Sequence, residues 1–565
     1  MRHATMKALA VAAIAGMALA ACGSSGSGST GGKSSPASAK PLVIDDTPLS
    51  PMTDSFNPYD ATSTGHIVTA DALYNEPLFI WDILKPSQPP YDILGTGYSW
   101  SDGGRTLTIT TRSGVKWNDG KPFTAADVAF TFNMIRTHPG VATDGTPVPV
   151  SASAPNATTA VLHFSQPEYA NLFLIGQTYI VPEHIFSKVS NPATWADPRP
   201  VGTGPYMLDK FTPQGFTLKE NPNYWDKSAV HVPEISYPAY PQNFNITQPL
   251  AAGQIDLAGN DIANVQSVYL GKSPDNHTWF PSAPYLTSNN VVSLIFNVKK
   301  APLNDPAVRQ AISYGIDRQQ LSAQGETGYE LPITSTAGVL EPAFTSSLNP
   351  SLANNLPATG DPAKVTSILR ADGWSKVGGK WTKNGKTISF SIEDPIPYSD
   401  YYLDAQEIAH QLNALGFNVT VKGDANPNTW TADVTSGNFD TAIHWSNQGP
   451  GQYYIYDGEM DASLTAPVGK SAANDYGRFD DPAAQQALAQ YASSNSPSVQ
   501  QQALYKLESI MSTQVPAAPL LNGAAWWEFS TRDYTGWPSS SNPVMNPTTN
   551  SPYLEETILH LKPVS

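Results

Sequence analysis

A single cysteine, Cys22, is the feature that most limits what this chain of 565 residues can fold into. One thiol cannot close an internal disulfide, and it cannot supply the cysteine ligands of a structural zinc site or an iron–sulfur cluster. A hydrophobic core must therefore hold the fold. Hydrophobic residues make up 40% of the chain, a share that indicates a globular protein.

The position of Cys22 indicates its role. Arg2 and Lys7 precede an uncharged, alanine-rich run of 14 residues, which is too short to cross a bilayer and is typical of a signal peptide. The run ends in Leu19-Ala20-Ala21, and this order resembles the bacterial lipobox, in which the cysteine is lipidated. The resemblance predicts a signal peptide over 1–21; the alternative is an ordinary cleaved signal with an incidental cysteine.

The segment that follows, 23–40, consists almost entirely of Gly, Ser, Thr, Ala and Lys. Such a composition cannot bury a core and is typical of a flexible tether. With the lipidated cysteine, 22–40 predicts a folded body anchored to the outer side of the bacterial cell membrane, either periplasmic or at the cell surface. Acyl chains anchor stably because each buried methylene contributes about 0.8 kcal/mol.

The charge excludes one class of partner. The net charge is −16, from 32 basic and 48 acidic residues, and Lys and Arg form no cluster along the sequence. Nucleic-acid binding requires clustered basic side chains on the phosphates. We therefore expect no nucleic-acid partner, and the acidity also argues against a polyanionic ligand.

The body mixes strands and helices. Alternation over 106–112 predicts a half-buried strand, with Leu107 and Ile109 on one face. Thr124 and Asp127 form a capping box, which predicts a helix start. The apolar face of that helix is predicted at i, i+4 and i+7 as Val128, Phe132 and Ile135.

Further helix starts share the pattern of a capping side chain followed by proline. They are Asp305-Pro306, Asp361-Pro362, Asp481-Pro482 and Ser496-Pro497. An amphipathic helix is predicted over 401–415, ending at Gly416, with a strand over 417–421. A strand directly after a helix favours α/β lobes.

Catalytic signatures are missing from the sequence. It contains no Gly-x-Ser-x-Gly elbow, no His-Glu-x-x-His helix and no Walker A loop. The pairs Asp45-Asp46 and Asp480-Asp481 are typical of turns and caps. A glycosidase needs no sequence motif for its two carboxylates, so a surface hydrolase stays a distant alternative. We expect a non-enzyme with no metal and no organic cofactor.

Six stretches, in order along the chain, resemble the extracellular solute-binding proteins of family 5, the peptide-type binding proteins of ABC importers. The most specific runs over 101–128, a strand, a glycine turn, an Asp-Gly turn and a capped helix. The others are 55–58, 73–79, 200–206, 221–225 and 296–321.

The resemblance implies an α/β fold of the type II periplasmic binding proteins, two lobes that close around a ligand, with a domain inserted in the first lobe. The implied first lobe comprises 41–68, 200–288 and 520–565. The insert is 69–199, and the second lobe is 289–519. The implied function is to capture an oligopeptide outside the membrane and deliver it to an ABC permease and its ATPase, as a monomer.

Ligand chemistry stays open between two classes. Peptide binders of the family carry a Trp-x-x-Asp-Tyr stretch whose aspartate binds the peptide amine. Here the matching stretch begins at Trp445, and Asn447 or Gln448 stands near the place of the aspartate. Because an amide holds an ammonium less well than a carboxylate, an oligosaccharide is the alternative ligand.

The candidate ligand-binding residues follow from the resemblance and from this departure. Trp445, Ser446 and Asn447 are the first candidates. Tyr74, Asn75 and Glu76, expected at the mouth of the facing lobe, come next. Tyr453 and Trp526 complete the set because Tyr and Trp faces suit sugar rings and apolar side chains; the alternative for these aromatics is core packing.

Overall fold

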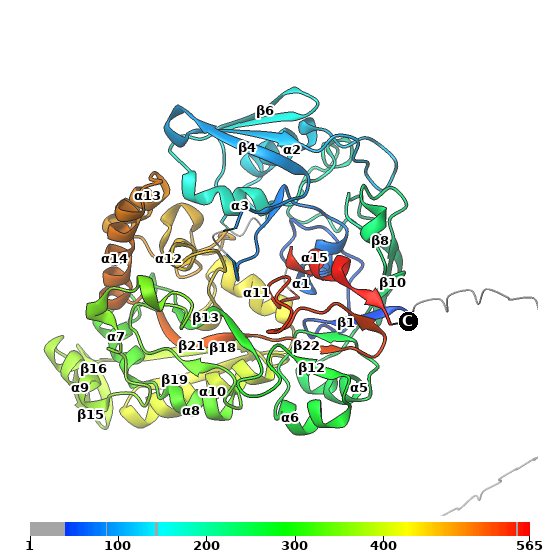
Figure 1. Ribbon diagram of the computed structural model, residues 1–565. Coiled ribbons are helices and arrows are strands. Elements are labelled where there is room, and N and C mark those ends of the chain that lie inside the picture. Colours follow the sequence, from blue (N-terminus) through cyan, green and yellow to red (C-terminus); the bar gives the residue numbers. More distant parts are fainter. Residues whose placement is uncertain (1–39, 86–87, 142–144, 550–551, 565) are drawn as a thin grey trace, which may run out of the picture. The chain divides into compact units, whose positions relative to one another are not determined.

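The computed structural model describes residues 40–85, 88–141, 145–549 and 552–564 (Figure 1). The predicted signal peptide, Cys22 and nearly all of the predicted tether lie outside these ranges. No helix in the described ranges has the length and apolar character needed to cross a bilayer.

Seven strands form one large sheet in the order β12-β22-β11-β1-β10-β9-β8. β1 pairs in parallel with β10 and β11, and the other neighbours are antiparallel. The strands are β1 Leu42–Asp45, β8 Tyr206–Thr212, β9 Gly215–Glu220, β10 Glu234–Pro238, β11 Leu257–Ala258, β12 Asn276–Thr278 and β22 Glu528–Ser530.

A second sheet of six strands has the order β14-β21-β13-β20-β18-β19. The chain crosses between the two large sheets after β12, over 279–286, and again after β21, through Trp526 and Trp527. The strands are β13 Thr287–Phe296, β14 Leu331–Pro332, β18 Ser389–Pro395, β19 Asn418–Asp424, β20 Thr441–Trp445 and β21 Ala517–Ala525.

A third sheet of four strands carries α2 on one face, and its strands all come from the stretch predicted as the insert. It comprises β4 Gly95–Ser101, β5 Thr106–Thr111, β7 Thr159–His163 and β6 Ser151–Asn156, in that order. Small sheets pair β2 Phe79–Ile80 with β3 Tyr91–Asp92, join β15 Ser375–Val377, β16 Lys380–Lys383 and β17 Lys386–Thr387, and pair β23 Tyr534–Thr535 with β24 Lys562–Pro563.

Helices flank the sheets (Figure 1). They are α1 Thr64–Ile67, α2 Ala125–Thr137, α3 Leu172–Gln177, α4 Glu183–Phe186, α5 Thr247–Ala251, α6 Val265–Val268, α7 Pro306–Gly315, α8 Arg318–Gln324, α9 Pro362–Ala371, α10 Ser399–Leu415, α11 Pro427–Ser436, α12 Tyr453–Met460, α13 Pro482–Ala492, α14 Pro497–Gln514 and α15 Tyr553–His560.

Most predicted helix starts are confirmed. Thr124 and Asp127 form the capping box of α2, and the predicted apolar face of that helix is buried. Asp305, Asp361 and Asp481 each accept a main-chain N–H at the start of α7, α9 and α13. α14 does begin after Ser496, but the side chain of this serine caps no N–H; its hydroxyl bonds that of Ser498.

The core of the four-stranded sheet continues into the helices beside the six-stranded sheet. One buried cluster contains Phe132 of α2, Phe173 of α3, Tyr454 of α12 and Leu488 of α13. In this structure the shared core packs the insert against α12 and α13.

Candidate ligand-binding cavity

A cavity of about 550 Å³ lies between the two large sheets and is bounded on a third side by α3. Its walls include residues next to β1 and β11 of the first sheet, β20 and the end of β21 of the second, and α3 of the insert. Ligand cavities of proteins commonly enclose 300–1,000 Å³. Since all three parts of the fold line it, a bound molecule would contact each of them.

An aromatic stack forms one wall of the cavity. The ring of His444 stacks on Trp430 and on Trp445, with ring centroids 5.5 Å and 4.8 Å away and interplanar angles of 16° and 19°, and the two tryptophan rings also touch each other, with centroids 5.8 Å apart. Burial lowers the pKa of His444 to about 4, so this ring is neutral at pH 7. The outermost ring, Trp445, is 38% exposed and offers a flat, uncharged face to a ligand.

Ser446 and Asn447 also line the cavity, directly after β20. Ser446 continues the pairing with β13, because its N–H donates to the oxygen of Val291 and its hydroxyl accepts the Val291 N–H at 3.0 Å. Asn447 accepts a hydrogen bond from the amide of Asn474 at 3.0 Å, and its own Nδ2 is buried without a partner. The Nδ2 of Asn447 thus lies against Gly458 of α12, and the Ser446 hydroxyl already serves the fold.

Trp526 lines the cavity where the chain crosses from β21 to β22. It is partly exposed and meets Tyr329 edge to face, with centroids 6.1 Å apart. The structure thus brings four of the eight candidate residues to one cavity: Trp445, Ser446, Asn447 and Trp526.

The structure does not place the other four at the cavity. Tyr74 is fully buried, and its hydroxyl donates to the main-chain oxygen of Phe56 at 3.1 Å. Asn75 and Glu76 are buried beside it, and Glu76 accepts a hydrogen bond from Trp225 Nε1 at 2.6 Å.

Tyr453 is also buried inside the fold. Its hydroxyl donates to Asp457 at 2.9 Å, and its ring stacks on Tyr491 with centroids 4.3 Å apart. Tyr453 therefore packs in the core, which is the alternative given above for the candidate aromatic residues.

Several motifs that carry the family resemblance meet one another, and among the described residues of all six stretches only Pro58 lines the cavity. The N–H of Gly204 donates to the oxygen of Tyr74, and the N–H of Asn118 donates to the oxygen of Gly202. The Asn223 amide donates to the oxygen of Asn118 at 3.1 Å. These motifs join the four-stranded sheet to the seven-stranded sheet, so they fix the frame around the cavity.

Several residues of the cavity wall carried no signal in the sequence. Among them are Trp430 of the aromatic stack and the amides Gln177, Asn260, Asn289 and Asn290. Single amides on α3, on β13 and after β11 form no motif, and only the tertiary fold brings them together. They supply donors and acceptors without charge.

The charge of the cavity wall has one sign. Its described residues include Asp46, Asp71, Asp261 and Asp400 but no Lys and no Arg. Asp46 accepts hydrogen bonds from Thr47 and Thr549, and Asp71 pairs with His66 at 3.1 Å. The wall thus suits neutral or cationic groups and repels anions.

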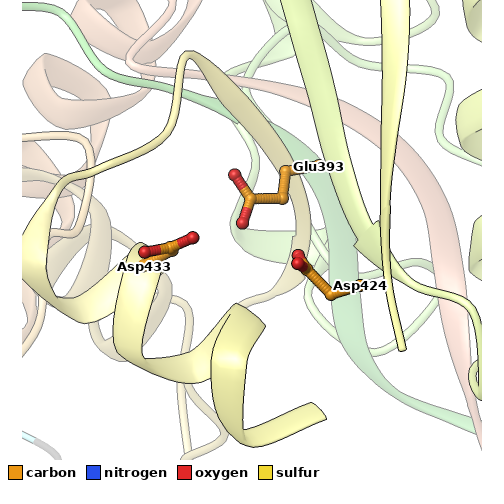
Figure 2. A group of neighbouring side chains, drawn as sticks. All are labelled: Glu393, Asp424 and Asp433. Atoms are coloured by element: carbon orange, nitrogen blue, oxygen red, sulfur yellow. The ribbon is translucent and has the colours of Figure 1, made fainter. Parts of the chain in front are cut away.

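One group of carboxylates outside the cavity has the spacing of a metal site. Glu393 of β18, Asp424 of β19 and Asp433 of α11 point toward one another (Figure 2). The ammonium of Lys422 lies among them, 2.7 Å from Glu393 and 2.6 Å from Asp433. Because this lysine already supplies the positive charge, the group joins β18, β19 and α11 and does not fit a metal ion.

Known proteins share sequence and fold with this chain. The chain matches the bacterial extracellular solute-binding proteins, family 5, over residues 90–458. It is 26% identical over 333 residues to the glutathione-binding protein GsiB of Salmonella typhimurium, covering 57% of this chain and 59% of that protein. It is 24% identical over 398 residues to the nickel-binding periplasmic protein of Escherichia coli K12, covering 67% and 72%. The chain thus spans about three fifths of the glutathione-binding relative's length.

Solved structures share the fold over nearly the whole chain. The mannohexaose-bound periplasmic oligopeptide-binding protein of Thermotoga maritima has a TM-score of 0.84 at 24% identity, covering 93% of this chain and 99% of that one. The oligopeptide-binding protein AppA of Bacillus subtilis, in complex with a nonapeptide, has a TM-score of 0.75 at 17% identity, covering 94% and 100%. With the match over most of its length, the chain belongs to the extracellular solute-binding proteins of family 5 and has the fold of the type II periplasmic binding proteins.

Proposed function

We propose that this protein is the substrate-binding lipoprotein of an ABC importer, which captures a solute outside the cell membrane and delivers it to a permease. The observation that carries the proposal is the cavity of about 550 Å³ lined from both large sheets, next to the two places where the chain crosses between them. Bending at such crossings lets lobes close on a ligand, and a permease can then distinguish the closed form from the empty one.

The proposed lobes keep the bounds expected from the family. The first is 41–68, 200–288 and 520–565, the second is 289–519, and the insert is 69–199.

The lipid anchor on Cys22 and the tether over 22–40 belong to the same proposal, as does a monomeric state. Detergent phase partition of the full chain tests the anchor. The wild-type protein should enter the detergent phase, and the Cys22→Ala variant should stay in the aqueous phase. Equal partition of the two proteins would contradict a lipid anchor on Cys22.

The proposed ligand is an oligopeptide. The amide groups of the cavity wall match the alternating donors and acceptors of a peptide backbone, and the aromatic faces suit apolar side chains. Relatives named for glutathione and oligopeptide binding support this class. A thermal-shift screen tests it: short peptides should raise the melting temperature, and no response across a broad peptide library would contradict it.

An oligosaccharide is the second candidate, favoured by the stack of Trp430, His444 and Trp445 and by a described wall without Lys or Arg. Sugar rings stack on flat aromatic faces and bond to amides, and they need no cation. Calorimetric titration with cello-, xylo- and manno-oligosaccharides distinguishes the two classes, because binding heat is expected for sugars only if this candidate is right.

A further inference from the structure

Six buried carboxyl groups gather where the two large sheets meet. Two come from the side of the seven-stranded sheet, one after β11 and one in β22. The other four come from the side of the six-stranded sheet, on α10 and in the loop between α8 and β14. We call them the junction carboxyl cluster: Asp261, Glu326, Glu330, Asp400, Asp404 and Glu528, each at most 9% exposed.

These groups are close enough to repel one another. Burial is the largest cause that raises the pKa of Asp261 and Glu330, and the charge of Asp400 raises both further. The charge of Asp261 in turn raises the pKa of Glu326, Asp404 and Glu528. The cluster is thus one electrostatic unit that spans the junction.

The cluster has no cationic partner among the residues that the structure describes. None of its members forms an ion pair with a described Lys, Arg or His. Both side-chain oxygens of Glu326, Asp404 and Glu528 are buried without a hydrogen-bond partner. A buried carboxyl group without partners is costly, so a positive charge beside the cluster would be strongly stabilised.

Two members of the cluster reach the cavity, one from each side of the junction. Asp261 and Asp400 line it. Asp400 accepts a hydrogen bond from Asn243 at 3.3 Å, while Oδ1 of Asp261, a residue 9% exposed, is buried without a partner. Of the aspartates in the described wall, Asp46, Asp71 and Asp400 are each bonded to a neighbour, whereas Oδ1 of Asp261 has no partner.

We propose that Asp261 and Asp400 together bind an organic ammonium group of the ligand, from the amino terminus of a peptide or from an amino sugar. This inference rests on the proposed function and names the subsite that takes the charge. It places amine recognition at the junction, away from the Trp445 stretch, where Asn447 and Gln448 stand in place of the aspartate of peptide binders.

A metal ion is a poorer occupant of the same place. A hard divalent cation such as Ca²⁺ takes six to eight oxygen ligands. Within the described ranges, the members of the junction carboxyl cluster do not bring three ligand atoms within 4.8 Å of one another. An ammonium held by one carboxylate from each side needs no such convergence, and it would draw the two sides together.

Calorimetric titration of the purified protein tests the amine subsite with four probes: trialanine, N-acetyl-trialanine, the trimer of glucosamine, and cellotriose. We expect at least one amine-bearing probe to bind about tenfold or more tightly than its uncharged counterpart, a difference of about 1.4 kcal/mol. Equal affinities within both pairs, or binding of the uncharged probes alone, would overturn the inference and leave the proposed function standing. Silence of all four, and of broad peptide and saccharide libraries, would overturn both.

Substitutions assign the effect to these residues. Asp261→Asn and Asp400→Asn should each lower the affinity for the amine-bearing probe about tenfold and leave that for its uncharged counterpart unchanged. Asp209→Asn changes the net charge equally at a partly exposed site on β8 paired with Lys219, and it should bind as wild type. Melting temperatures check that each variant folds, and wild-type binding of the amine by folded Asp261→Asn and Asp400→Asn would overturn the assignment.

Discussion

The hydroxyl of Tyr454 in α12 donates a hydrogen bond of 2.7 Å to the main-chain oxygen of Ala170, across the border between the proposed second lobe and the insert. The ring of Phe173 packs on the same tyrosine, with centroids 4.9 Å apart. If the lobes separate when the cavity opens, this contact exists in the closed form alone. It would then stabilise the state that holds the ligand.

Replacing Tyr454 with phenylalanine should therefore weaken ligand binding about fivefold, because one net hydrogen bond contributes about 1 kcal/mol. The matched control is Tyr269→Phe, which removes a 2.7 Å hydrogen bond to the oxygen of Phe529 on one side of the junction. The control should lower the melting temperature without changing the dissociation constant. Unchanged affinity in the Tyr454 variant would show that this contact does not stabilise the closed, ligand-bound form.

Replacing Trp445 with alanine should cost about 1–3 kcal/mol of binding free energy, because the exposed face of the aromatic stack would be lost. Tyr98→Ala removes an aromatic ring of similar exposure, 45%, that does not line the cavity, and it should bind as wild type. Dissociation constants from titration check both variants. A wild-type constant for folded Trp445→Ala would remove this residue from the binding site.

Gly202 lies at a close main-chain contact in the frame around the cavity, so a substitution there tests how much that contact contributes to stability. A Cβ at this position would lie 1.6 Å from the main-chain oxygen of Tyr74, and neither segment can shift without breaking the hydrogen bonds between them. Gly202→Ala should therefore lower the free energy of unfolding by more than about 3 kcal/mol or prevent folding. Gly97→Ala, where a Cβ meets nothing within 4 Å, is the control, and denaturant unfolding of both measures the difference.

The recognisable motifs predicted the fold better than the site. The segments around Tyr74, Gly202 and Asn223 carry specific patterns because close main-chain contacts and turns require particular residues there. Helix starts such as Thr124 and Asp305 were predictable because a cap is local, set by side chains within three residues of the helix. These local rules fix the elements and say little about a ligand.

The cavity wall could be predicted only in part. Trp445 was found because it lies in a stretch comparable with the family, but its neighbour Trp430 comes from another element with no such pattern. Tyr74 and Tyr453 were candidate ligand-binding residues in the sequence and are buried in the structure. Which face of a segment is buried depends on packing between segments far apart in the chain. The junction carboxyl cluster, whose members are spread over 261–528, could not be predicted from the sequence for the same reason.

Asp45 predicts a specific pH dependence of stability. Burial, and next the charge of Asp46, raise the pKa of Asp45 from 3.8 to about 8. Between pH 4 and pH 8 the folded chain holds a proton that the unfolded chain has released. The stabilisation by this group is therefore complete below pH 4 and is lost as the pH rises toward 8, at about 1.4 kcal/mol per pH unit.

The variant Asp45→Asn should remove this part of the slope. Urea unfolding of wild type and variant at pH 5 and pH 7 measures it, since the titrating groups other than the neighbouring Asp46 contribute alike to both proteins. The variant should gain stability relative to wild type as the pH rises. A difference between the two proteins that is the same at both pH values would contradict the assignment to Asp45.

Native mass spectrometry shows directly whether the cavity holds a solute. The purified protein would be measured as isolated and again after incubation with a mixture of short peptides and oligosaccharides. We expect an added mass, lost on denaturation, that corresponds to one peptide or one saccharide per chain and is reduced in Trp445→Ala. Spectra that show only the bare chain under both conditions would contradict it.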